Sequence, residues 1–219
     1  HTGIGFDQLL WLEAPRSAAM DIFYRVFNAD GSEVEQCGNG ARCIARYLAD
    51  EPDADRRRSW RLGFNGGVAQ AELLADDQVA VQIAVPNFSP AALPMNAPEG
   101  EQYLYSETVA DQSLEFAAVS VGNPHAVLRV ASIESAPVAT WGPLLETHER
   151  FPSRANIGFM QVVDTERIRL RVHERGVGET RACGTGACAA VVVGRRSGEL
   201  ADEVTVELPG GELRVRWAG

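Results

Sequence analysis

The segment Cys37-Gly38-Asn39-Gly40-Ala41-Arg42-Cys43 returns later in the chain as Cys183-Gly184-Thr185-Gly186-Ala187-Cys188. An alternating run of apolar and polar residues precedes each copy, at residues 22–27 and 168–174. A Gly-Gly pair follows each copy, at Gly66-Gly67 and Gly210-Gly211. Because each feature is separated from its counterpart by nearly the same number of residues, we predict that a whole structural unit is duplicated.

Each unit has the pattern of a strand, a Cys-Gly loop, a helix and a hairpin. In the second copy the alternation places Arg169, Arg171 and His173 on the polar face of a half-buried strand. Residues 183–193 carry no polar face beyond Thr185, so this helix should be buried nearly all round, most simply inside a curved sheet. The predicted fold class is therefore α+β, with two pseudo-symmetric halves, each a curved, mostly antiparallel sheet wrapped around a central helix.

The two halves are expected to span residues 1–81 and 82–219. Val79, Val81, Ile83 and Val85 alternate as a further strand after a turn at Asp76-Asp77. A proline-rich stretch then marks the crossing between the halves, with prolines at Pro86, Pro90, Pro94 and Pro98.

Composition excludes several classes of protein. The chain has 219 residues, 30 acidic and 20 basic, for a net charge of −10, and every basic residue is an arginine. Without lysine these residues cannot form a Schiff base or supply a Walker A lysine. Net acidity with scattered arginines argues against nucleic acid and membrane as partners, and the triplet Arg56 to Arg58 is interpreted as a solvated loop. We expect a soluble, cytoplasmic protein.

The two Cys-Gly loops suit proton-transfer chemistry. A cysteine before Gly-x-Gly and a helix places its sulfur at a helix N-terminus, where unpaired N–H groups favour the thiolate and can hold a carboxylate. If the halves face each other, they present one sulfur to each face of a single carbon. Stereoinversion requires this arrangement, because one group removes a proton while the other donates to the opposite face. The pattern thus predicts inversion of an amino-acid α-carbon without pyridoxal phosphate or any other cofactor.

Plainer interpretations apply to the other cysteine features. Cys43 and Cys188 are interpreted as small buried hydrophobic residues. Zinc would require C-x-x-C pairs, which are absent from the sequence, so no metal site is expected. A Cys37–Cys183 disulfide would be an inactivation product, and a thiol redox protein is disfavoured by the same spacing.

The cysteine loops and several further segments resemble the diaminopimelate epimerases, a pyridoxal-independent family of amino-acid epimerases. The resemblance runs through nearly the whole chain in family order. It rests on residues 2–8 (Thr-Gly-Ile-Gly-Phe-Asp-Gln), residues 27–32, the Cys37 loop, Gly122-Asn123-Pro124-His125, residues 154–158, and Glu174-Arg175-Gly176 through Glu179-Thr180 to the Cys183 loop.

The resemblance implies the role of each site residue. Cys37 and Cys183 are the acid/base groups, assisted by His125 and Glu174. The reacting carboxylate is held by backbone N–H groups of Gly38, Asn39, Gly184 and Thr185, with Gln8 against the same end of the substrate. Asn28, Asn123, Asn156 and Arg175 hold the distal end, Arg175 pairing its carboxylate and Glu174 its ammonium. Taken singly, Asn28 and Asn156 are interpreted as turn residues, and Glu174-Arg175 could be a surface pair. In combination with the cysteine repeat, the site interpretation is favoured.

The implied activity is interconversion of LL-2,6-diaminopimelate and its meso form, in lysine and peptidoglycan-precursor biosynthesis, by a homodimer when intact. Family members open with a His-Gly-x-Gly-Asn-Asp-Phe strand and continue beyond the position of Gly219, so this chain is interpreted as lacking terminal segments. Arg181 stands where many members have Gln or Leu. Two alternatives remain: a related proline or hydroxyproline racemase, and an inactive binding fragment.

Overall fold

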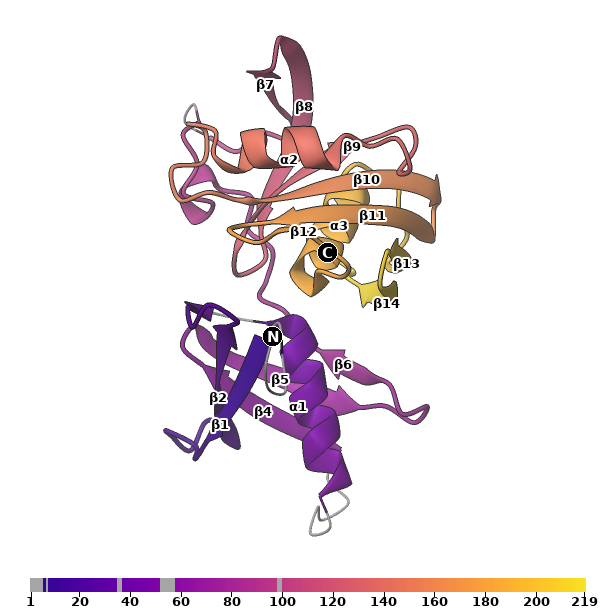
Figure 1. Ribbon diagram of the computed structural model, residues 1–219. Coiled ribbons are helices and arrows are strands. Elements are labelled where there is room, and N and C mark those ends of the chain that lie inside the picture. The colour runs from indigo at the N-terminus through magenta and orange to yellow at the C-terminus, as the bar shows by residue number, and fades with distance from the viewer. Residues whose placement is uncertain (1–5, 7, 35–36, 52–57, 98–99) are drawn as a thin grey trace. The chain divides into compact units, whose positions relative to one another are not determined.

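The structure, a computed structural model, describes residues 6, 8–34, 37–51, 58–97 and 100–219 (Figure 1). The chain divides into two compact units, His1–Ile83 and Ala84–Gly219. The prediction for the Arg56–Arg58 triplet lies outside the described residues at Arg56 and Arg57, as does the predicted crossing at Pro98. Among the described residues, no helix combines the length and apolar character needed to cross a membrane.

The first unit is a mixed sheet with one helix against it. Its elements are β1 (Gln8–Glu13), β2 (Ile22–Asn28), β3 (Glu33–Val34), α1 (Gly38–Asp50), β4 (Ser59–Phe64), β5 (Gly67–Leu73) and β6 (Val79–Val81). The strand order is β1-β2-β4-β5-β6, with β3 paired to β2. Alternation along the strands sends Tyr24, Val26 and Leu62 into one core, where they pack against Ala41 and Ile44 of α1.

The second unit is larger and follows the same plan. Its elements are η1 (Pro90–Ala92), β7 (Tyr105–Val109), β8 (Gln112–Ser120), β9 (Pro124–Arg129), α2 (Val138–Glu146), β10 (Asn156–Asp164), β11 (Arg167–Glu174), β12 (Gly178–Thr180), α3 (Gly184–Arg196), β13 (Glu203–Leu208) and β14 (Gly211–Arg216). The sheet order is β14-β13-β11-β10-β9-β8-β7, with β12 paired to β11.

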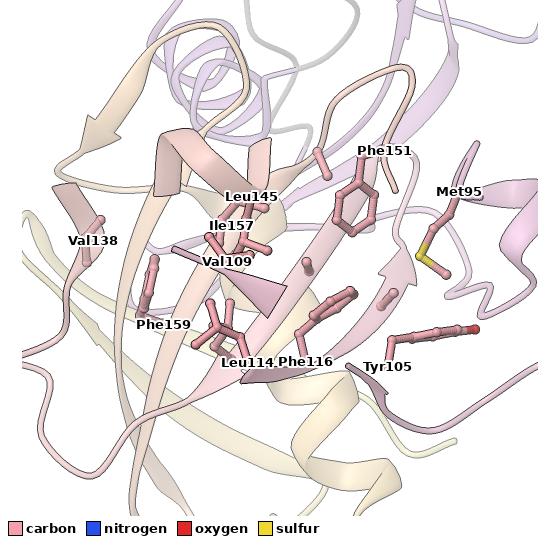
Figure 2. Close-up of a cluster of buried hydrophobic side chains, with 14 of the residues drawn as sticks. Met95, Tyr105, Val109, Leu114, Phe116, Val138, Leu145, Phe151, Ile157 and Phe159 are labelled. Carbon is pink, nitrogen blue, oxygen red and sulfur yellow. The ribbon is translucent and has the colours of Figure 1, made fainter. Parts of the chain in front are cut away.

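Both faces of this second sheet are covered. Residues 124–128 of β9 are all buried, which a strand with one wet face would not allow. The helix α3 packs against β8, β9, β10, β11 and β14 and is buried at nearly every position from Thr185 to Gly194. A separate cluster of apolar side chains includes Phe116, Phe151 and Phe159, together with Leu145 from α2 (Figure 2). The prediction of a helix buried nearly all round is therefore confirmed.

The duplication is visible in the strand pairing. In the first unit β3 pairs antiparallel with β2, α1 follows, and β4 runs parallel to β2 before the hairpin to β5. In the second unit β12, α3, β13 and β14 repeat these steps against β11. The α+β class with two related, mostly antiparallel halves is confirmed. The parallel pairs were not predicted, and they arise because a helix connects each to its neighbour.

Three local predictions were wrong. The strand expected over residues 79–85 ends at Val81, and Val85, which precedes Pro86, is 86% exposed. The pairing with β5 ends with the bond from Gln82 N to Gln70 O, at 2.9 Å, so Ile83 and Val85 lie beyond it. Cys43 is exposed rather than buried. Within its unit, α1 packs against the sheet with one face, and Cys43 lies outside that face. His173 was placed on a solvent-facing side of β11 but is 7% exposed, since α2 lies over that end of the strand.

Candidate functional site

Each predicted catalytic cysteine lies at the N-cap of its helix. Cys37 and Cys183 both have extended backbone conformation, and their sulfurs accept hydrogen bonds from Gly40 N at 3.3 Å and Gly186 N at 3.4 Å. An N-cap acceptor satisfies one of the N–H groups that a helix leaves without an internal partner. The remaining first-turn N–H groups belong to Gly38 and Asn39 in one unit and to Gly184 and Thr185 in the other, as predicted.

The glycines of these loops allow a close approach between helix and strand. A Cβ built on Gly40 would lie 2.7 Å from Leu10 Cδ2, and one on Gly186 would lie 2.9 Å from Val172 Cγ2 and 3.2 Å from Cys183 Sγ. Real Cβ atoms do not tolerate such distances, so only glycine fits without a shift. The Gly-x-Gly pattern thus fixes where each sulfur sits relative to the neighbouring strand.

Around Cys37 the structure brings together three of the predicted residues. The Cys37 thiol donates to Gln8 Oε1 at 3.3 Å, and Gln8 Nε2 donates to Asn28 Oδ1 at 3.1 Å. Asn28 Nδ2 in turn donates to Ser32 Oγ at 3.1 Å. A series of hydrogen bonds through two neutral side-chain amides therefore connects the sulfur to β1 and β2.

Cys183 lies in a more enclosed setting, with 5% of its surface exposed. Thr185 Oγ1 lies 3.6 Å from its sulfur. Burial, followed by the nearby Glu174 carboxylate, raises the pKa of the Cys183 thiol to about 12, while Thr185 and Gly186 N–H act in the opposite direction. The expectation that the helix terminus would lower the pKa was wrong for this cysteine, because desolvation and a like charge outweigh it.

His125 is connected to Cys183 indirectly, by hydrogen bonds through Asn123 and Thr185. Its Nε2 donates to Asn123 Oδ1 at 3.0 Å, and Asn123 Nδ2 donates to Thr185 Oγ1 at 3.4 Å. Its Nδ1 is buried and has no hydrogen-bond partner among the described residues. Burial, with a contribution from the Arg175 charge, lowers the pKa of His125 to about 3, so the imidazole is neutral at physiological pH.

Glu174 is the last residue of β11, and Arg175 follows it directly. The Thr180 hydroxyl donates to Glu174, and Arg175 Nη1 donates to Ser153 O at 3.4 Å. The buried Asn156 accepts from Arg175 N at 3.0 Å and donates to Pro124 O at 3.1 Å. Its amide is therefore engaged with the backbone of two site segments.

Sequence reasoning missed a buried ionisable pair beside this segment. Glu146, at the end of α2, and His173, on β11, are 6% and 7% exposed. The signal for His173 was obscured by its place in an Arg-x-Arg-x-His alternation, and Glu146 had no motif around it. Among the described residues, no group of three or more His, Cys, Asp or Glu side chains is placed to hold a metal ion.

The sequence model of the family described as diaminopimelate epimerase matches residues 1–89 and 117–219. A diaminopimelate epimerase from Pseudomonas aeruginosa is 55% identical over 219 residues, which is 100% of this chain and 79% of that protein. The chain belongs to the diaminopimelate epimerase family. A second diaminopimelate epimerase, from Stutzerimonas stutzeri, is 52% identical over the same shares of both chains.

Solved structures resemble the fold of this family member at low identity. A hydroxyproline epimerase from Agrobacterium vitis matches with a TM-score of 0.69 and 15% identity, covering 97% of this chain and 66% of that one. A phenazine biosynthesis protein from Bacillus anthracis matches with a TM-score of 0.61 and 15% identity, over 96% and 76%. These likenesses concern the fold alone.

Proposed function

We propose that this protein is an isomerase that interconverts LL- and meso-diaminopimelate without a cofactor, with Cys37 and Cys183 as its two acid/base groups. The observation that carries the proposal is the repeated N-cap: each unit places one cysteine sulfur at the start of a helix that begins Gly-x-Gly. The 52–55% identity to relatives named diaminopimelate epimerase supports this substrate over proline or hydroxyproline.

The two thiols exchange protons with one carbon. In one direction the Cys37 thiolate takes the α-proton, so an S–H bond forms as the C–H bond breaks and the electron pair is delocalised into the substrate carboxylate. The Cys183 thiol then donates its proton to the opposite face and becomes a thiolate. The high pKa of Cys183 keeps it protonated for the donor role. Before the next turnover in the same direction, Cys37 releases its proton to solvent and Cys183 takes one from solvent by way of the adjacent Glu174 carboxyl.

The remaining site residues hold the substrate in this proposal. N–H groups at the two helix N-termini stabilise the charge that develops on the reacting carboxylate. Arg175 pairs the distal carboxylate and Glu174 the distal ammonium. The amides that complete the site are Gln8, Asn28, Asn123 and Asn156. Asn123 serves a second purpose, because it links the neutral His125 to Thr185 and hence to Cys183.

We also infer the cellular setting from the proposed reaction. The substrate is a small diamino diacid, and its interconversion belongs to lysine and peptidoglycan-precursor biosynthesis. We therefore propose that the protein is cytoplasmic. The family resemblance further implies that it is a homodimer.

Deuterium incorporation tests the proposal directly. In deuterated water, the purified protein should wash deuterium into the α-position of LL-diaminopimelate, seen as loss of the α-proton signal by NMR, and meso product should accumulate. Cys37→Ala and Cys183→Ala should each abolish epimerisation, whereas Cys43→Ala, which changes an exposed cysteine outside the N-cap, should not. An unchanged α-proton after long incubation, or equal turnover of proline, would overturn the proposal.

A further inference from the structure

The Glu146 side chain contacts the segment that carries Glu174 and Arg175, at Gly176. One carboxylate oxygen accepts from Gly176 N at 2.8 Å, and the other lies 2.8 Å from His173 Nε2. Arg154 Nη1 approaches the first oxygen at 3.4 Å. The Glu146 and His173 side chains are only 8% and 9% exposed, so they form a buried polar cluster and not a surface ion pair.

Two neighbouring backbone N–H groups of the segment are held from behind by buried side chains. Arg175 N donates to Asn156 of β10, and Gly176 N donates to Glu146 of α2. Gly176 has φ = +74°, so the chain turns sharply here. The turn cannot move without breaking a bond to one of these side chains, each of which belongs to a regular element.

The cluster is poorly explained by stability alone. A carboxylate at the C-terminal end of a helix opposes the helix dipole, and a buried charge loses its hydration. Apolar residues of similar volume commonly replace such a pair without loss of stability. Close packing also restricts the site, because a Cβ on Gly142 of α2 would lie 2.7 Å from His173 Cβ. The hydrogen bonds with Gly176 N and His173 offset these costs, and they do so by tying the Glu146 carboxylate to the turn.

We propose that Glu146, supported by His173, is a positioning residue that fixes the Glu174-Arg175-Gly176 turn, and through it the guanidinium that takes the distal carboxylate of the substrate. The inference rests on the proposed function, since it concerns how that site is held. Glu146 itself touches no reacting atom in this scheme. Its loss should therefore weaken substrate binding more than it slows proton transfer.

The test compares steady-state kinetics of four proteins. Glu146→Ala removes the acceptor for Gly176 N, and Glu146→Gln keeps an oxygen there without the charge. Glu107→Ala is the matched control in the same unit: Glu107 is a carboxylate with a 16% exposed side chain, and it pairs with Arg150 and His148. Because a misplaced guanidinium weakens its charge-assisted bonds to the distal carboxylate, we expect Glu146→Ala to raise KM for diaminopimelate by roughly 10- to 100-fold, with kcat within about threefold.

Glu146→Gln should restore KM to within about threefold of wild type, and Glu107→Ala should leave KM unchanged even if it lowers the melting temperature. If Glu146→Ala does not fold, Glu146→Asp replaces it, since the shorter carboxylate keeps the charge but falls short of Gly176 N, and KM should rise again. The inference is overturned if Glu146→Ala, or Glu146→Asp in its place, keeps the wild-type KM, or if Glu107→Ala raises KM equally. A wild-type protein that does not epimerise diaminopimelate would instead overturn the proposed function.

Discussion

Gly186 lies where α3 meets β11, and a single methyl group added there tests how tightly the sulfur of Cys183 is held. In Gly186→Ala the new Cβ would sit 2.9 Å from Val172 Cγ2 and 3.2 Å from Cys183 Sγ. Val172 is β-branched and lies in a central strand, so it has little freedom to move. The start of α3 must therefore shift away from β11, and the sulfur of Cys183 at its N-cap moves with it.

Two opposing contributions set the size of the effect on stability. Overpacking a closed site costs about 1–3 kcal/mol, and alanine is better than glycine inside a helix by about 1 kcal/mol. The net loss should be about 1 kcal/mol, which lowers the melting temperature by about 2–4 °C for a chain of this size. Epimerase activity should fall more steeply, about tenfold or more, because the sulfur that we propose as an acid/base group is displaced.

Gly158→Ala is the matched control in the same unit, since a Cβ on this β10 glycine meets Leu170 Cδ1 at an ordinary 3.6 Å. It tests the same substitution beside β11 without a clash. Calorimetry and the deuterium assay should place Gly186→Ala below both wild type and Gly158→Ala. A Gly186→Ala protein that melts at or above the wild-type temperature and retains full activity would refute the assigned packing.

Three further predictions follow from buried polar groups. Glu174→Gln should lower the pKa of Cys183 by removing a like charge, so the midpoint of its alkylation against pH should move down; an upward shift would contradict this. The Tyr24 hydroxyl is buried without a hydrogen-bond partner in the described part of the chain, so Tyr24→Phe should leave chemical-denaturant stability within about 1 kcal/mol of wild type or raise it. Burial raises the pKa of Glu146, but Gly176 N–H, His173 and Arg154 outweigh it and lower the pKa overall. This contribution to stability is present above the unfolded pKa of about 4.3 and is lost at lower pH, so wild type should lose more stability on acidification than Glu146→Gln.

The sequence revealed the duplicated frame because its signals are local. The Cys-Gly-x-Gly segment needs glycine for close packing, and a helix begins within it. Cys37 and Cys183 could therefore be placed at N-caps before any tertiary structure was known. Alternation likewise predicted β2 and β11. These features depend on residues within a few positions of one another.

What could not be predicted depends on contacts between distant segments. The burial of His173 results from α2, which lies about thirty residues earlier and carries Gly142 against the ring. The raised pKa of Cys183 likewise requires Glu174 and the surrounding core to be in place, which the local helix-terminus argument ignored. Tertiary burial can reverse a local electrostatic expectation, because desolvation acts on the charged form whatever the helix dipole favours.

The duplicated frame gives both sulfurs the same backbone geometry, but their side-chain neighbours differ in kind. Cys37 donates to the neutral amide of Gln8, which continues to Asn28, whereas Cys183 lies beside the Glu174 carboxylate and the Thr185 hydroxyl. A two-base mechanism needs one thiolate and one thiol at a time, and identical surroundings would give the two groups no preference. A carboxylate beside Cys183 favours its protonated form, so in the proposed mechanism the division of roles between acid and base follows from residues that the duplication did not copy.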